Sequence, residues 1–211
     1  MRISDIKRQK RNQNRFSIYI DGKYAFSLDY DTLDGSHIHI GDTVSDDGKK
    51  VLIQKDEFSR VRDYAHTLLS YRDRTEYEIK TRLFDKGFHA GTIREVLEFL
   101  KSRNLIDDKS FAGKWVDNIF TSRPMGRMRV EHELKKRRIN EDIIQEVCDK
   151  KLGQDTEYEL ARKAAEKKLN SLKSYPGEVA RKRLFSFLRN RGFDFEIIRD
   201  LMKEYFSDVI E

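Results

Sequence analysis

The spacing of hydrophobic residues changes along this chain, from a two-residue period near the start to a helical period over most of the remainder. Phe16–Ile20 and Tyr24–Leu28 alternate apolar and polar side chains on either side of an Asp-Gly turn signal, which predicts a β-hairpin. A two-residue turn would place the apolar sets of the two strands on opposite faces. A three-residue loop, Asp21–Lys23, pairs Ile18 with Phe26 on one face, and we favour this interpretation.

A short basic segment, Lys7–Arg11, precedes the hairpin. Such a segment can contact phosphate groups. It can also form the outer edge of a sheet, where charged side chains discourage pairing with other chains, and this second interpretation is slightly favoured.

From about residue 48 onward the apolar residues follow a helical period, which Pro124 and Pro176 interrupt. One apolar pattern, with successive spacings of four, five, five and three residues, occurs three times. Its copies are Ile79, Leu83, Phe88, Ile93 and Val96; Val130, Leu134, Ile139, Ile144 and Val147; and Leu184, Leu188, Phe193, Ile198 and Leu201. The first two positions of each copy share one face of a helix and the last two lie on a second helix. Each copy therefore predicts a helical hairpin.

The turn inside each predicted hairpin has its own sequence signal. Gly87 and Gly192 stand where a helix ends in the left-handed conformation, and glycine adopts that conformation without a steric penalty. Arg138 occupies this place in the second copy. We expect that turn to be strained or differently shaped.

Further helices follow the first two copies. Asp107-Asp108 predicts the start of a helix that carries Phe111, Trp115 and Ile119, and Thr156–Glu159 has the form of a capping box. A second capping box, Thr75–Glu78, opens the first copy. The expected fold is all-α, an elongated tandem array of three-helix repeats with a small N-terminal β-hairpin extension. The expected domains are residues 1–45 (hairpin extension), 46–123 (linking helix and first repeat), 124–175 (second repeat) and 176–211 (third, truncated repeat).

Composition is consistent with this array and sets limits on function. Hydrophobic residues make up 37% of the 211 residues, below the roughly 45–50% of an ordinary globular domain. The formal charge of +6 makes a polyanion a plausible partner, although net charge alone is a weak indicator. The single Cys148 excludes an internal disulfide, and no apolar run is long enough for a membrane span. A cytoplasmic location and no membrane contact are expected.

Candidate catalytic and metal-binding residues have simpler explanations. No Gly-rich phosphate loop or nucleophile-elbow motif is present. His37 and His39 would share one face of a strand but lack further ligands, and Cys148 is expected to be buried. Asp46-Asp47 and Asp107-Asp108 precede predicted helices, whose free N–H groups they can cap. We therefore expect no enzyme, no cofactor and no metal site.

The basic residues fall into two groups by helical phase. With Val130 and Leu134 facing inward, outward positions are held by Arg129, Lys135 and Lys136, and in the third copy by Arg183 and Arg189. By contrast, Lys86, Arg137 and Arg191 share one position near a helix end, where a cation complements the helix dipole. Tyr71 and Tyr77 flank Arg72 and Arg74 and are possible contact residues.

Three segments of the chain, in this order along the sequence, resemble the RecX family of RecA modulators. They are Leu69–Phe88, Leu105–Trp115, which is similar to the family's LIDD-x-x-FA-x-x-W segment, and Gly126–Ile139, which is similar to GR-x-R-x-x-x-EL-x-x-x-x-I. The match runs from about residue 60 to 205 and leaves out the hairpin. The resemblance implies a three-helix tandem-repeat fold that binds in the groove of the RecA–DNA filament and mainly inhibits its growth, ATP hydrolysis and strand exchange.

The expected partners are therefore the RecA filament and DNA phosphates, bound by a chain that acts as a monomer. Candidate recombinase- or DNA-binding residues are Arg72, Arg74, Arg127, Arg129, Lys135, Lys136, Arg183 and Arg189. The alternative function is a free-standing helical DNA-binding protein, which would bind DNA equally well without the recombinase. The resemblance leaves open whether filament ends are capped or grooves are filled, and whether inhibition or stimulation dominates in the cell.

Overall fold

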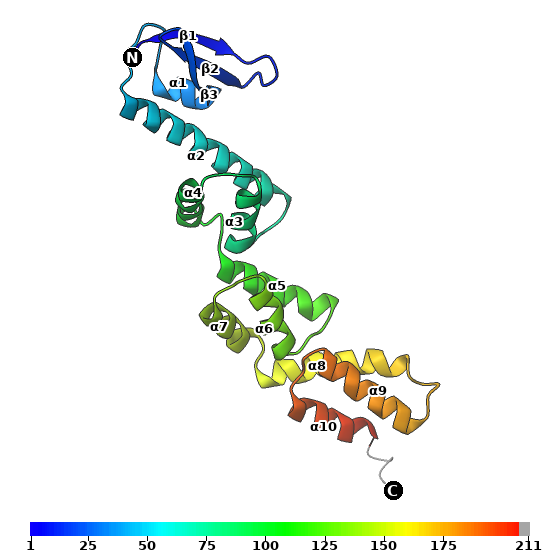
Figure 1. Cartoon of the computed structure of the whole chain (residues 1–211). Coiled ribbons are helices and arrows are strands. Elements are labelled where there is room, and N and C mark those ends of the chain that lie inside the picture. The colour runs from blue at the N-terminus through cyan, green and yellow to red at the C-terminus, as the bar shows by residue number, and fades with distance from the viewer. Residues whose placement is uncertain (207–211) are drawn as a thin grey trace. The chain divides into compact units, whose positions relative to one another are not determined.

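The computed structural model describes residues 1–206, in which three strands are followed by ten helices (Figure 1). The strands are β1 (Ile3–Arg8), β2 (Arg15–Ile20) and β3 (Lys23–Asp29). The helices are α1 (Tyr30–Ser36), α2 (Asp46–Tyr71), α3 (Glu76–Asp85), α4 (Ala90–Ser102), α5 (Asp108–Ser122), α6 (Arg127–Lys136), α7 (Glu141–Lys151), α8 (Gln154–Asn170), α9 (Gly177–Asn190) and α10 (Phe195–Phe206). The chain divides into two compact units, the first from Met1 to Asp73 and from Ile79 to Ile106, the second from Arg74 to Glu78 and from Asp107 onward.

The predicted hairpin is present as β2 and β3, and β1 extends it to a three-stranded antiparallel sheet. Ile18 pairs with Phe26 as expected, but the loop between them is shorter than the one we favoured. Ile20 pairs with Lys23, so the turn is the two-residue Asp21-Gly22 pair, with φ values of 49° and 80°. A bulge in β3 shifts the register between the turn and Ile18, and this shift returns Phe26 to the same face.

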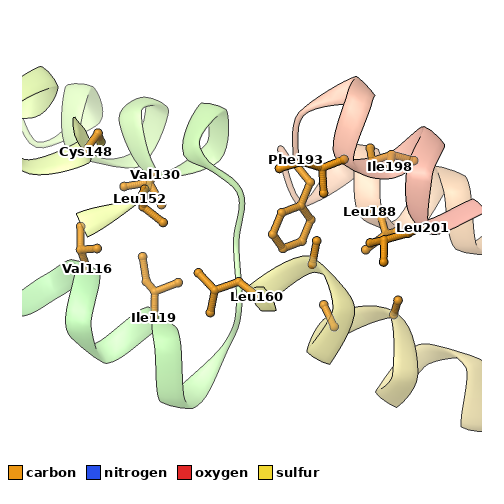
Figure 2. Packing of buried hydrophobic residues seen from close by; sticks show 14 of the residues in the cluster. Val116, Ile119, Val130, Cys148, Leu152, Leu160, Leu188, Phe193, Ile198 and Leu201 are labelled. Atoms are coloured by element: carbon orange, nitrogen blue, oxygen red, sulfur yellow. The ribbon is translucent and has the colours of Figure 1, made fainter. Parts of the chain in front are cut away.

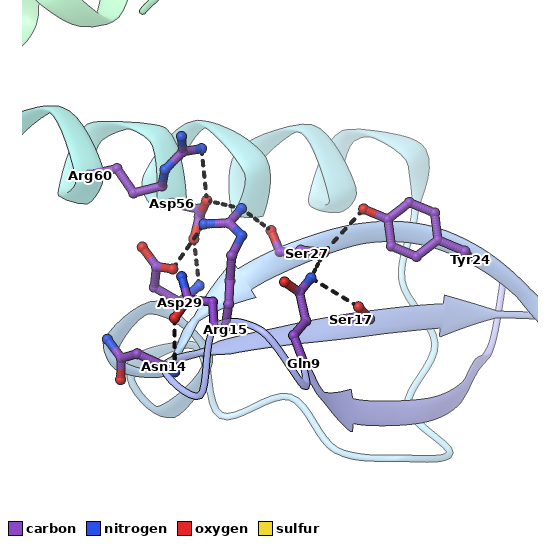
Figure 3. Close-up of polar contacts among 10 residues, drawn as sticks. Gln9, Asn14, Arg15, Ser17, Tyr24, Ser27, Asp29, Asp56 and Arg60 are labelled. Atoms are coloured by element: carbon purple, nitrogen blue, oxygen red, sulfur yellow. Dashed lines mark hydrogen bonds and ion pairs between the residues drawn. The ribbon is translucent and has the colours of Figure 1, made fainter. Parts of the chain in front are cut away.

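The sheet is fixed to α2 by apolar packing and by a buried carboxylate. Residues Ile3, Ile18, Ile20, Phe26 and Leu28 form one cluster with Val44 and Leu52. Asp56 of α2, only 3% exposed, accepts a hydrogen bond from the Asp29 backbone N–H at 2.6 Å and pairs with Arg15 at 3.0 Å (Figure 3). Because a buried charge is tolerated only when it is paired and hydrogen-bonded, this network specifies how the sheet lies on α2.

Of three local predictions near the amino terminus, the one for His37 and His39 is wrong and the other two agree with the structure. His37 and His39 do not lie on a strand: His37 ends α1 in the left-handed conformation, and the segment continues as turns. Asp46 and Asp47 lie in the first turn of α2, as the capping interpretation predicted, although Ser45 supplies the hydrogen bond to the Gly48 N–H. The basic segment begins inside β1, which is an outer strand of the sheet, in agreement with the favoured interpretation.

The repeated apolar pattern marks the cores of three helical hairpins. Fourteen of its fifteen positions are buried, and Phe88 is partly buried against the same cluster as Ile79 and Leu83. Figure 2 shows the part of this packing that joins the second and third copies, where Leu160 of α8 lies near Ile119 and Phe193. The spacing in the sequence thus predicts which residues form the core.

The helices group differently from the expected domains. The helix predicted at Asp107 is α5, and the expected domains include it in the first repeat. Its core residues Ala112, Val116 and Ile119 instead belong to one cluster with Val130 and Leu134. The long helix therefore comes first in each group: α2–α4, α5–α7 and α8–α10. Thr156 is not an N-cap, because α8 begins at Gln154 with Gly153 before it. A capping motif in the sequence locates the start of a helix only to within about a turn, and Thr156 lies inside the first turn of α8.

The three hairpin turns have one shape despite their different residues. Gly87, Arg138 and Gly192 have φ values of 85°, 58° and 76°. In each turn the following residue donates its N–H to the carbonyl five residues back, at 3.4 Å: Phe88 to Leu83, Ile139 to Leu134 and Phe193 to Leu188. Of the two outcomes expected at Arg138, strain rather than a different shape is found, because a side chain there carries a steric cost that glycine avoids.

Candidate partner-binding surface

The cations predicted on the outer face of α6 are exposed, and each one contacts an acid of the same helical hairpin. Arg129 pairs with Glu133 at 2.8 Å, Lys136 with Glu133 at 3.6 Å, and Lys135 with Glu141 at 2.9 Å. Burial alone would raise the pKa of the Glu133 carboxyl, but the neighbouring charges of Lys136, Arg129 and Arg137 outweigh it and hold that pKa below its usual value. The exposed pair of Lys135 and Glu141 contributes little stability, whereas the half-buried Glu133 carboxylate is shared by several cations.

Arg127 differs from these exposed cations because its guanidinium joins α6 to α7. Its Nε lies 2.9 Å from Glu131, and its Nη2 lies 2.7 Å from Asp149 and 2.8 Å from Gln145. The side chain is 31% exposed. These contacts favour a structural role for Arg127 in joining the two helices of the hairpin over a role in binding a partner.

The two cations predicted on α9 are also exposed, but they have no carboxylate partner within residues 1–206. The Arg183 guanidinium lies over the Tyr175 ring, 4.0 Å from its centroid. Arg189 has no side-chain hydrogen bond or ion pair in the part of the chain that the structure describes. Their positive charge is therefore less compensated than that of α6.

Arg72 and Arg74 lie in the segment that follows α2. Arg72 is exposed and donates from Nη1 to the Asp73 carbonyl at 2.8 Å, whereas Arg74 is half-buried. Of the tyrosines beside them, Tyr71 is 78% exposed, and Tyr77 lies under the Arg138 guanidinium at 5.9 Å.

A cluster that sequence reasoning missed lies where the second and third repeats meet. Arg123, Arg129 and Arg191 line a cleft of about 130 Å³ together with Met125 and Asn190. Arg191 donates to the Pro124 carbonyl at 2.7 Å, and burial, aided by the charge of Arg123, lowers the pKa of its guanidinium. Within the described residues neither Arg123 nor Arg191 forms an ion pair. Three guanidinium groups around one small cleft favour a phosphate oxyanion as ligand.

The backbone at this junction is packed too closely for side chains. Gly126 donates its N–H to the Arg191 carbonyl at 2.9 Å, and a Cβ on Gly126 would lie 2.1 Å from the Gly192 carbonyl oxygen. Glu157, 5% exposed, accepts hydrogen bonds from the N–H groups of Arg127 at 3.0 Å and Asp194 at 3.3 Å. The cleft is therefore formed in advance by backbone contacts. Arg123 and Arg191 are far apart in the sequence, so only this tertiary contact reveals the cluster.

The cations Lys86, Arg137 and Arg191, which share one position in the three copies, have identifiable contacts at helix ends. Lys86 lies over the Tyr64 ring at 5.6 Å, and Arg191 over the Phe187 ring at 4.7 Å. Arg137 lies 4.9 Å from the Trp115 ring centroid and donates to the Glu133 carbonyl at 2.8 Å. Contacts with aromatic rings favour a structural role for these three cations, and the predicted interaction with the helix dipole stays a prediction.

Residues 1–206 contain no group of three or more potential metal ligands among His, Cys, Asp and Glu. Burial, as the largest cause, raises the pKa of the Cys148 thiol to about 11, so this cysteine carries little thiolate at neutral pH. Among the described helices, none combines the length and apolar character needed to cross a membrane.

Three helical hairpins, with exposed cations on α6 and α9, define the class of protein as a helical-repeat protein. Four family models match the chain: the regulatory protein RecX N-terminal domain at residues 1–45, and the first, second and third RecX three-helix domains at residues 62–100, 107–147 and 155–202. The match of the RecX N-terminal domain to residues 1–45 includes the β-sheet, which lies outside the segments that resemble the family in sequence. The boundaries also follow the observed helix groups.

Known proteins support the same assignment across nearly the whole chain. A regulatory protein RecX from Clostridium perfringens (strain 13 / Type A) is 31% identical, and one from Clostridium botulinum (strain Eklund 17B / Type B) is 30% identical. In each case the alignment covers 96% of this chain and 95% of the relative. A crystal structure of regulatory protein RecX superposes with a TM-score of 0.73 at 25% identity, over 94% of this chain and 98% of that one. The chain belongs to the RecX family of regulatory proteins.

Proposed function

We propose that this protein binds the RecA–DNA filament as a monomer and modulates it, mainly by inhibiting filament extension, ATP hydrolysis and strand exchange. Membership of a family whose members are named regulatory proteins is the observation that carries the proposal. The chain itself contributes no catalytic step and needs no cofactor. The recombinase performs the chemistry, and this protein changes how much recombinase is assembled and active.

Two surfaces of the second compact unit support a role for DNA phosphates in this binding. The Arg123, Arg129 and Arg191 cleft is small, preformed and lacks carboxylates among its lining residues. The exposed cations Lys135, Lys136, Arg183 and Arg189 add positive charge on α6 and α9. Because cations that neutralise phosphates release counterions, binding should weaken steeply as salt concentration rises. Arg72 and Arg74 remain candidates for contact with the recombinase itself.

Sedimentation separates this function from that of a free-standing DNA-binding protein. The protein would be mixed with RecA filaments on single-stranded DNA, and in parallel with the same DNA alone. We expect much stronger retention by the filaments. Equal retention by DNA alone would favour the alternative function and overturn the proposal.

A recombinase ATPase assay tests the inhibitory step. Increasing amounts of this protein would be added to RecA on single-stranded DNA. Inhibition well below one molecule per RecA would indicate blocked filament extension at the ends, and inhibition near equal amounts would indicate binding along the groove. An unchanged ATPase rate despite filament binding would contradict inhibition as the outcome.

A further inference from the structure

The third repeat contains a groove between α9 and α10 that is unlike its counterpart in the second repeat. The groove has a volume of about 700 Å³ and is lined by Glu178, Arg181, Lys182, Phe185, Ser186, Phe195, Arg199, Met202 and Lys203. Its floor is apolar, formed by Phe185, Phe195 and Met202, and Phe195 is 63% exposed. Four cations stand on its two sides, with one glutamate among the lining residues.

The apolar repeat pattern aligns each groove residue with one in the second repeat. In that repeat, Arg127 of α6 reaches across to Asp149 and Gln145 of α7, and a second ion pair joins Lys135 to Glu141. The corresponding hairpin is thus bridged by its own opposite charges. No anionic partner from outside is needed there.

The third repeat replaces these bridging groups with cations and aromatic rings. Arg181 corresponds to Arg127, while Lys203 and Arg199 stand where Asp149 and Gln145 stand in the second repeat. The acids Glu131 and Glu141 correspond to Phe185 and Phe195. Cations consequently face cations across the groove, and within residues 1–206 Arg181, Lys182 and Lys203 form no ion pair. Arg199 contacts only its neighbour Asp200, at 3.4 Å.

This arrangement defines the chemistry of an occupant. Like charges on both sides of a groove repel each other unless an anionic group lies between them. An exposed phenylalanine beside a nearly buried methionine loses water-exposed apolar surface when an apolar side chain covers it. On α9 the lining positions 178, 181, 182 and 185 follow helical spacing, so the groove runs along the helix. A ligand that satisfies all three conditions is an elongated segment with an apolar face flanked by carboxylates.

We propose that the α9–α10 groove is a docking site for an acidic amphipathic helix of a partner protein, which supplies the carboxylates that the second repeat supplies from its own helices. Apolar side chains of that helix cover Phe185, Phe195 and Met202. Its acidic side chains pair with Arg181 and Lys182 on one side and Arg199 and Lys203 on the other. Helix-in-groove recognition of this kind uses apolar anchors at one-turn spacing and flanking charges for orientation.

A single nucleic-acid strand fits the same groove less well. Stacking of bases requires open ring faces, but Phe185 and Phe195 contact each other edge to face, with ring centroids 6.3 Å apart and an interplanar angle of 81°. The two rings therefore form an apolar floor and not a common stacking platform. The proposal does not depend on recombinase or DNA binding elsewhere on the molecule.

Fluorescence anisotropy on the full chain tests the proposal with three probes at low salt. The first is a labelled helical peptide with Leu and Phe on one face and Glu at the flanking positions. The second carries Lys in place of each Glu, and the third is a labelled single-stranded oligothymidylate. We expect the acidic peptide to bind and the basic peptide to fail.

Two variants and a matched control locate the site. Arg181→Glu with Lys203→Glu should weaken the acidic peptide about tenfold or more and allow the basic peptide to bind, since the charges across the groove are then reversed. Phe195→Ala should weaken the acidic peptide roughly five- to thirtyfold, as for removal of an apolar anchor. Lys163→Glu with Lys167→Glu, at exposed positions of α8, should leave its affinity unchanged. Circular dichroism confirms that each variant is folded.

Three outcomes would overturn the proposal. One is that the acidic peptide does not bind the unaltered chain. Another is that it binds equally well after charge reversal at Arg181 and Lys203. The third is that oligothymidylate binds in its place and no longer binds that double variant, which would assign the groove to nucleic acid.

Discussion

The Glu157 carboxylate accepts a hydrogen bond from the Arg127 backbone N–H at 3.0 Å and so ties the start of α8 to the start of α6. The same relationship occurs one repeat earlier, where Asp108 at the start of α5 accepts from the Glu76 N–H at 2.9 Å. Each acid lies in the first turn of the long helix that opens a repeat, and each satisfies a free N–H of the preceding repeat's middle helix. Within the second unit, an acid in the first turn of one helix therefore serves twice as the acceptor for the start of another helix.

Removal of the Glu157 side chain should destabilise the second unit. Glu157→Ala leaves the N–H groups of Arg127 and Asp194 without their shared acceptor, which should cost about 1–3 kcal/mol of unfolding free energy. Glu157→Gln keeps the accepting oxygen and should cost much less. Urea unfolding followed by circular dichroism measures both. Equal losses for the two variants would show that charge, not the acceptor, matters.

Glu157 also predicts a pH dependence of stability. Burial, as the largest cause, raises the pKa of this carboxyl, so the folded state holds its proton at pH values where the unfolded state has released it. Stability should then fall as pH rises from the ordinary glutamate pKa of the unfolded chain through the raised pKa of the folded state. Glu157→Gln should flatten this part of the profile. The check is urea unfolding of both proteins at a series of pH values, and identical slopes would contradict the assignment.

The turn at Arg138 should become more stable when glycine replaces arginine. Arg138 has a φ of 58°, a conformation that costs an L-residue about 1–2 kcal/mol relative to glycine, so Arg138→Gly should raise the unfolding free energy by up to about 1 kcal/mol. Removing the guanidinium from the Tyr77 ring offsets part of this gain. Gly87→Ala is the converse control, because its φ of 85° disfavours any side chain, and it should lower the melting temperature.

The close contact between Gly126 and Gly192 should not tolerate a methyl group. Gly126→Ala forces the backbone apart, since the added Cβ would lie 2.1 Å from the Gly192 carbonyl oxygen. Gly153 also precedes a helix, but no atom lies within 4 Å of an added Cβ there, so Gly153→Ala is a matched control. We expect thermal melting to show a drop of at least several degrees for Gly126→Ala and little change for Gly153→Ala. Similar melting temperatures would refute the close packing.

The hydrophobic pattern was sufficient to predict the hairpin cores because burial repeats with helical spacing, as at Leu134 and Leu188. Local signals were less reliable at boundaries. The pairing of Ile18 with Phe26 was right, yet the bulge that permits a shorter turn has no distinct signal in the sequence. The prediction that α5 belongs to the first repeat was wrong, because the order of helices in the sequence does not decide which neighbouring helix each one packs against. The cleft of Arg123 and Arg191 depends on the Gly126–Gly192 contact, which no local pattern shows.

The exposed cations of the second unit, among them Arg123 and Arg189, should control affinity for the filament without controlling the stability of the fold. Some of these cations form ion pairs in the structure and others do not. Arg129, Lys135 and Lys136 contact Glu133 and Glu141, so reversal of their charge would also place like charges together. Arg123 and Arg189 have no such acids within residues 1–206. Arg123→Gln with Arg189→Gln should therefore change the unfolding free energy by less than about 0.5 kcal/mol, as expected for exposed substitutions. Filament binding should weaken clearly.

The salt dependence of that variant provides the decisive measurement. If both side chains neutralise phosphates, the slope of log affinity against log salt should decrease in magnitude by about 1.4–1.8, at roughly 0.7–0.9 for each phosphate that is no longer neutralised. Lys163→Gln with Lys167→Gln removes the same charge from exposed positions of α8 and serves as the control for net charge alone. An equal decrease in both variants would mean that general charge attracts the filament and that the cleft at the junction of the second and third repeats has no particular role.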